Sequence, residues 1–116
     1  MNQEIIFLNK LAEAYQSYNT SVINEFLDED MHYSSMWVFQ ELTSKKEYLD
    51  YLSKKLQVMK EHNKRMDFEI VNGGMHNHAL LVKGQLSPEG SPFGFVADFN
   101  EKGKVVMLNI TIQSFF

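Results

Sequence analysis

The sequence predicts an α+β fold in which helices come first and an antiparallel β-sheet follows. Apolar residues recur every three or four positions in the first half of the chain and every second position after residue 66. All six glycines and both prolines follow residue 72, where turns between strands are expected. Helices segregated from a run of strands are typical of a sheet that is covered on one face. We expect the 116 residues to form one domain, 1–116.

Three helices are expected to pack on the sheet. The first covers residues 4–18, where apolar side chains form a helical stripe, and a second, short helix covers residues 22–30. The third begins at Ser44, which fits a capping box with Glu47, and ends near 62–63. Lysines on this helix alternate with glutamates and are expected to form a solvated face.

Five extended runs are expected to form the sheet. The first covers residues 31–39 and lies between the second and third helices. Gly103 is suited to a left-handed position in the last hairpin. The helices cover one face only, and apolar residues on the other face, including Val105 and Met107, predict a homodimer through the sheet face. The later runs cover residues 66–71, 78–86, 93–99 and 104–112.

Composition and charge restrict the function classes. The net charge of −4 argues against a nucleic acid partner, since phosphate binding requires a cationic face. Cysteine is absent, which excludes disulfides, a thiol nucleophile and a thiolate metal site. The first ten residues do not fit a signal peptide and no stretch approaches a membrane span. We therefore expect a cytoplasmic protein with no membrane partner.

The run at 31–39 holds the only tryptophan and a candidate pocket face. Alternate side chains of an extended strand share a face, so Tyr33, Ser35 and Trp37 point one way. His32 points the other way. An aromatic ring, a hydroxyl and an indole on one face can line a pocket or fill a core.

Two stretches carry a resemblance to a known superfamily. They are FLDEDMHYSSMWVF followed by LTSKKEYLDYL, and the closing hairpin DFNEKGKVVMLNI. In order and spacing the chain resembles the nuclear transport factor 2-like superfamily, which includes SnoaL-like cyclases and ketosteroid isomerases. The resemblance implies a cystatin-like cone, with three N-terminal helices on a curved antiparallel sheet and a pocket between them. It implies that the following residues face that pocket: Tyr33, Ser35, Trp37, Phe95, Ala97, Phe99, Leu108, Ile110 and Ile112.

The catalytic residues of the isomerases do not carry over. In a gapless alignment the position of their base falls on Ser35, and that of their hydrogen-bonding acid falls on Phe95. Their helix-one tyrosine falls on Leu11, with Tyr15 one turn later. Serine has no useful basicity near neutral pH and phenylalanine can neither donate nor accept a hydrogen bond, so steroid-type isomerisation is not expected. The Asp–Arg–Asp network of the epoxide-opening members is not expected either, because Arg65 is the only arginine.

His32 and Asp98 are the candidate proton-transfer residues. Imidazole titrates near neutrality and the acidic residues 28–30 can orient it, while burial in an apolar strand would raise the pKa of Asp98. Strand parity turns both side chains away from the expected pocket, which favours surface or interface roles. His76 and His78 share a face in an extended segment, but no further ligand accompanies them, so no metal is expected.

Tyrosines and the tryptophan are the residues most suited to contact a ligand. A buried Tyr or Trp requires a partner for its polar tip, and in a cone that partner can be a ligand. Tyr15, Tyr33 and Trp37 are therefore either ligand contacts or core residues. No phosphate loop, nucleophile elbow or zinc-helix motif is present, and no cofactor is expected.

Three hypotheses for function remain. The first is a cone that binds a small apolar or aromatic ligand. The second is an enzyme of the dehydratase, cyclase or isomerase type with a non-standard acid–base set. The third is a non-enzymatic protein-interaction module. We rank ligand binding first, because no base–acid–oxyanion set matches the spacing. The expected ligand contacts are Tyr15, Tyr33, Ser35, Trp37, Phe95, Phe99, Leu108 and Ile110.

Overall fold

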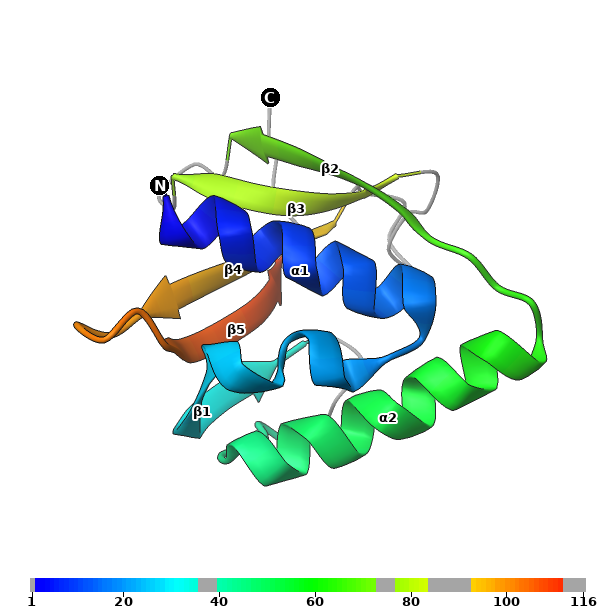
Figure 1. The fold of residues 1–116 in the computed structure, drawn as a ribbon, viewed down its shortest axis with the longest axis horizontal. Helices are drawn as coiled ribbons and strands as arrows, with labels where there is room; N and C mark the ends of the chain where they lie inside the picture. The colour runs from blue at the N-terminus through cyan, green and yellow to red at the C-terminus, as the bar shows by residue number, and fades with distance from the viewer. Residues whose placement is uncertain (1, 36–39, 73–76, 84–92, 112–116) are drawn as a thin grey trace.

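The computed structural model describes residues 2–35, 40–72, 77–83 and 93–111. Within these ranges the two long helices and the five strands follow the predicted order (Figure 1). The elements are α1 (Gln3–Ser17), β1 (Leu27–Ser34), α2 (Lys45–Glu61), β2 (Asp67–Asn72), β3 (His78–Lys83), β4 (Gly94–Phe99) and β5 (Val105–Thr111). Trp37, His76 and Ile112, for which the sequence made predictions, lie outside the described residues.

Polar side chains fix where the two helices begin. The Asn2 side chain accepts a hydrogen bond from the Glu4 backbone N–H at 2.9 Å, and the Ser44 hydroxyl accepts one from the Glu47 N–H at 3.1 Å. The Glu47 carboxylate accepts from the Thr43 N–H at 3.1 Å, one residue earlier than in the predicted capping box. Residues next to each helix start therefore determine where it lies. The start predicted from the sequence is within one residue of the observed start for both helices.

The predicted second helix is wrong. In its place lie two 3-10 turns, Thr20–Val22 and Asn24–Phe26, and β1 begins directly after them. The Asp28 carboxylate accepts a hydrogen bond from the Asp30 N–H at 2.9 Å and another from the Asn100 side-chain amide at 3.0 Å. These bonds hold the acidic segment extended beside the turn between β4 and β5, because a short Asp side chain competes for backbone groups instead of supporting a helix.

The five strands form one sheet in the order β1-β5-β4-β3-β2. Three pairings are antiparallel, as predicted, whereas β1 runs parallel to β5. The hairpin between β4 and β5 turns at Gly103, whose φ of 76° confirms the predicted left-handed position. Helix α1 packs across β2, β3 and β4, and α2 packs against β1, so both helices cover the same face (Figure 1).

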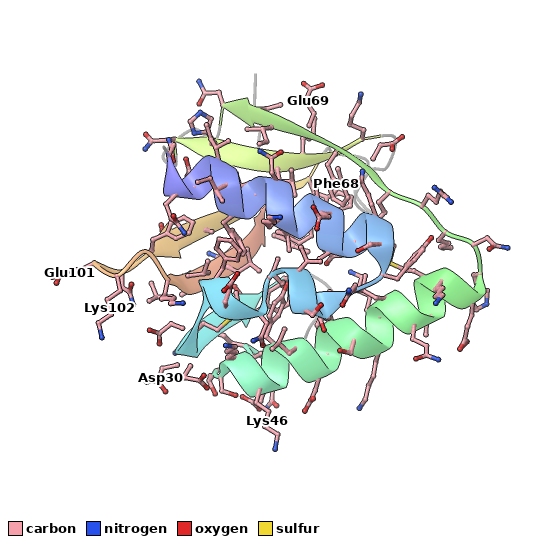
Figure 2. The ribbon with its side chains drawn as sticks, in the orientation of Figure 1. Asp30, Lys46, Phe68, Glu69, Glu101 and Lys102 are labelled. Atoms are coloured by element: carbon pink, nitrogen blue, oxygen red, sulfur yellow. The ribbon has the colours of Figure 1, made fainter. Side chains whose placement is uncertain are left out.

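Side chains alternate between the helix-covered face and the far face of the sheet. Phe68 points toward α1, whereas its neighbour Glu69 points away from the fold (Figure 2). The far face carries a small apolar cluster made of Val71, Ala79, Leu81 and Val96.

Val105 was predicted on the far face and instead belongs to the buried core. The reason is a register shift in the last hairpin, where Asp98 pairs with Met107 but Phe99 pairs with Val105. The residue left over on β5 exchanges the two faces at that point. This removes one of the apolar residues on which the predicted dimer face depended.

Neither of the two helices could cross a membrane, because within the described ranges each is too short or too polar for a bilayer span.

Candidate functional site

A pocket of about 370 Å³ opens between α2 and the sheet. One wall comes from α2 and the other from β4 and β5, and the segment leading into β2 closes one side. A pocket of this volume is within the range that accommodates small organic molecules. Its lining residues are Tyr51, Lys55, Met59, Lys64, Met66, Phe93, Phe95 and Ile110.

Helical spacing presents three of these residues to the pocket. Tyr51, Lys55 and Met59 follow one another at intervals of four along α2, so they lie on one face of the helix. Lys55 was predicted to lie on a solvated face, and this prediction is wrong. Its side chain is half-buried and lines the pocket.

The opposite wall depends on one cross-strand pair. Phe95 on β4 faces Ile110 on β5 in the antiparallel register, so both side chains lie on the helix-covered face. Next to Phe95, β4 also approaches β3 closely. A Cβ added at Gly94 would lie only 2.8 Å from the Leu80 carbonyl oxygen. The Phe95 ring contacts the ring of Tyr15, with centroids 5.5 Å apart.

Four tyrosines, Tyr15, Tyr33, Tyr48 and Tyr51, form a cluster beneath the pocket, which we call the tyrosine cluster. They come from α1, β1 and α2. The Tyr33 ring lies 4.7 Å from the Tyr48 ring and 5.5 Å from the Tyr51 ring, measured between centroids. Tyr51 is the one member of the cluster that lines the pocket. Its ring therefore lies between the pocket and the buried rings of the other three tyrosines.

Three hydroxyls of the tyrosine cluster, those of Tyr15, Tyr33 and Tyr48, are buried away from water. The pKa values of Tyr15 and Tyr48 are raised well above the ordinary value. Burial is the main cause, and the charges of neighbouring phenols add to it. Within the described parts of the chain, neither hydroxyl has a hydrogen-bond partner. A buried polar group without a partner costs about 1–3 kcal/mol, and such groups in a native protein call for an explanation such as a bound molecule.

Tyr33 is held by backbone bonds on both sides. Its N–H donates to the Leu42 carbonyl at 2.8 Å, and the Leu42 N–H donates to its own carbonyl at 2.9 Å. Burial raises the pKa of the Tyr33 phenol above its usual range, and the nearby Ser35 hydroxyl opposes that rise. The Tyr33 hydroxyl has no hydrogen bond of normal geometry to another described residue.

Lys55 brings a positive charge to these aromatic rings. Its ammonium nitrogen lies 5.9 Å from the ring centroid of Tyr15 and 5.9 Å from that of Tyr51, which is the range of cation–π attraction. Burial lowers the pKa of the Lys55 ammonium below its ordinary value. The pocket is therefore apolar on the sheet side and cationic on the helix side.

The predicted ligand contacts are divided among three places. Phe95 and Ile110 line the pocket, and Tyr15 and Tyr33 lie behind it in the tyrosine cluster. Leu108 is fully buried, and it is not among the lining residues. Phe99 packs against Phe7 on α1, with centroids 5.9 Å apart, and does not line the pocket. Ser35 is half-buried near Tyr33.

The predicted proton-transfer residues do not line the pocket. His32 lies on the side of β1 opposite Tyr33, with its Nδ1 atom 3.3 Å from the Glu41 carboxylate. Asp98 is exposed on the far face of the sheet. Both positions follow from the strand parity.

The described residues contain no group of three His, Asp or Glu side chains that could hold a metal ion. His78 has its Nδ1 atom 2.7 Å from the Glu4 carboxylate, a polar contact between β3 and α1.

Sequence reasoning missed most of the helix wall. Lys55 lies seven residues after Tyr48 and four before Met59, so helical periodicity alone would have placed it on the apolar side. Its charge had assigned it to the surface. Lys64 belongs to the segment between α2 and β2, where no periodic pattern indicates a facing direction. The missed lining residues are Tyr51, Lys55, Met59, Lys64, Met66 and Phe93.

Solved structures similar to this chain share its architecture. A SnoaL-like protein of unknown function from Burkholderia thailandensis superposes with a TM-score of 0.71 at 16% identity, covering 97% of this chain and 95% of that one. The chain has the SnoaL-like, nuclear transport factor 2-like fold. A nuclear transport factor 2-like protein of unknown function from Cytophaga hutchinsonii gives a TM-score of 0.62 at 12% identity, covering 94% and 97%.

A third structure with a similar fold is named as an enzyme. A steroid delta-isomerase from Pseudomonas aeruginosa gives a TM-score of 0.62 at 12% identity, covering 98% of this chain and 82% of that one. Identities this low establish the fold and leave the activity to the site itself. No protein-family model matches the sequence, and no curated protein does.

Proposed function

We propose that this protein binds a small apolar or aromatic molecule in the pocket between α2 and the strands β4 and β5. The observation that carries the proposal is the pocket itself, whose sheet side is formed by apolar side chains and whose helix side carries the polar tips of Tyr51 and Lys55. The hydroxyls of Tyr15 and Tyr48 lie behind it, buried and with no partner among the described residues, and neither side chain lines the pocket.

The pocket walls favour a flat, apolar occupant. Phe93, Phe95 and Ile110 form the sheet side, and the flexible thioethers of Met59 and Met66 can adapt to different shapes. The volume of about 370 Å³ accommodates two fused aromatic rings with a substituent.

The test is fluorescence titration with N-phenyl-1-naphthylamine, a neutral probe whose emission rises in apolar surroundings. We expect saturable binding to the wild-type protein. Ile110→Trp fills the pocket and should abolish it, whereas Met107→Trp, on the same strand but the opposite face, should leave it unchanged. Met59→Trp fills the pocket from α2 and serves as the second blocking variant if Ile110→Trp does not fold.

The proposal fails if the wild-type protein does not bind the probe. It also fails if folded blocking variants bind the probe as well as Met107→Trp does.

Catalysis is the second candidate, and Lys55 is the observation that favours it. An amine whose pKa is lowered by burial can exchange a proton with a bound carbonyl compound. The position of an isomerase base holds Ser35, so such chemistry would depend on the lysine. The test is deuterium exchange at the α-carbons of 2-tetralone, followed by NMR. Catalysed exchange that is lost in Lys55→Met supports this role, and exchange no faster than in buffer contradicts it.

A further inference from the structure

Positive charge is concentrated where the pocket meets the surface. Lys55 and Lys64 line the pocket itself. An adjoining hollow of about 410 Å³ shares Lys55, Met59 and Lys64 with it and adds Val58 and His62. The two hollows therefore adjoin at these three side chains, and the two lysines lie where the apolar pocket meets the adjoining hollow.

The described residues that line this surface include no acid. Among the described residues that line the pocket and the adjoining hollow there is no Asp or Glu. The chain as a whole carries more acids than bases, with 15 Asp and Glu against 11 Lys and Arg. Because the chain is acidic overall, lysines without an acid among the described lining residues are a local departure that favours an anionic occupant.

The Lys55 ammonium is also positioned to meet a ligand group. It lies over the rings of Tyr15 and Tyr51, and the Tyr15 hydroxyl has no partner among the described residues. An anion placed beside the ammonium gains a charge-assisted hydrogen bond in partly desolvated surroundings, where such bonds are stronger than at the surface.

We propose that the natural ligand is an amphipathic anion, an aromatic or apolar acid whose ring system occupies the pocket and whose carboxylate pairs with Lys55 at its mouth. Lys64 contributes a second, weaker attraction from the segment that follows α2. The apolar walls then supply most of the affinity, and the lysines select acids over neutral analogues of the same shape. The inference rests on the proposed function, since it names the ligand class of the same pocket.

The test compares two ligands that differ in charge and little else, 2-naphthoate and 2-naphthamide. Both are titrated calorimetrically into the wild-type protein and used to displace N-phenyl-1-naphthylamine. We expect naphthoate to bind about tenfold more tightly than naphthamide, which corresponds to one charge-assisted hydrogen bond.

Substitutions on α2 identify the charge responsible. Lys55→Met keeps the length and bulk of the side chain and should reduce the preference to about onefold. Lys54→Met is the matched control, because it removes an exposed charge from the adjacent position, and it should keep the preference. Lys55→Arg retains the cation and should retain most of the preference.

Each outcome decides between the two proposals. Binding of the neutral probe with equal affinity for naphthoate and naphthamide overturns the anionic-ligand inference and leaves the pocket proposal intact. A preference that survives in Lys55→Met, or disappears in Lys54→Met as well, overturns the role of Lys55. Failure of all three compounds to bind overturns the pocket proposal and the inference with it.

Discussion

Removing the Tyr48 hydroxyl should stabilise the unliganded protein. Tyr48 is fully buried, and its hydroxyl has no hydrogen-bond partner among the described residues. In the unfolded chain that hydroxyl bonds to water, so folding strips it of a partner at a cost of about 1–3 kcal/mol. Phenylalanine keeps the ring and its contact with Tyr33, 4.7 Å away between centroids, and removes only the costly atom.

The expected gain for Tyr48→Phe is about 1 kcal/mol in the free energy of unfolding, after a small loss of packing volume. In a chain of this length that gain corresponds to a rise of roughly 4–6 °C in Tm. Urea unfolding followed by far-UV circular dichroism measures the free energy, and a thermal scan measures Tm.

Tyr18→Phe is the matched control for this substitution. The Tyr18 hydroxyl donates a hydrogen bond to the Lys64 carbonyl at 2.6 Å. Its removal should therefore lower the free energy of unfolding by about 0.5–1.5 kcal/mol. The two Tyr-to-Phe changes are predicted to have opposite signs. If Tyr48→Phe destabilises the protein as much as Tyr18→Phe does, the buried hydroxyl has a partner and the reasoning about the tyrosine cluster is refuted.

Three further predictions concern packing, pH and assembly. Gly94→Ala should lower the free energy of unfolding by about 1–3 kcal/mol, because the added Cβ would lie 2.8 Å from the Leu80 carbonyl oxygen; urea unfolding with an unchanged midpoint would contradict it. Burial lowers the pKa of Lys55 in the folded state, so between that pKa and the ordinary value of 10.5 the unfolded chain binds the extra proton and stability rises with pH. Urea unfolding between neutral pH and the ordinary tyrosine pKa of 10.0 should give a more positive slope of stability against pH in Lys54→Met than in Lys55→Met, and equal slopes would count against it. The homodimer through the far face of the sheet stays a prediction. Light scattering should give twice the chain mass of 13.5 kDa, and Leu81→Glu should shift the protein toward monomer. A monomeric wild-type protein would contradict this prediction.

The fold could be predicted from the sequence because local residue patterns encode most of its helices and strands. Period-two alternation identified the strands after residue 66, and Ser44 located the start of α2 through the hydrogen bond that its hydroxyl accepts. Parity within β4 placed Phe95 and Asp98 on opposite faces, as the structure has them. These features depend on residues a few positions apart, so one sequence is sufficient to find them.

The errors arise where distant segments decide the local structure. The segment before His32 reads as the end of a helix, but Asp28 bonds to Asn100, which lies 72 residues later. Val105 changes faces through a register shift that only the pairing with β4 reveals. Lys55 was assigned by its charge, and its place beside Tyr15 depends on how α2 packs against α1 and the sheet. Contacts between residues so far apart in the chain cannot be inferred from the local patterns of a single sequence.

Methionine methyl NMR tests the pocket assignment most directly. Met59 and Met66 line the pocket, Met31 is buried in the core outside it, and Met107 lies on the far face of the sheet. All four carry an observable methyl group in protein labelled with 13C-methyl methionine. On titration with N-phenyl-1-naphthylamine the account predicts saturable shifts of the Met59 and Met66 signals, with Met31 and Met107 unchanged. Shifts confined to Met107, or no shift at any concentration, would contradict it.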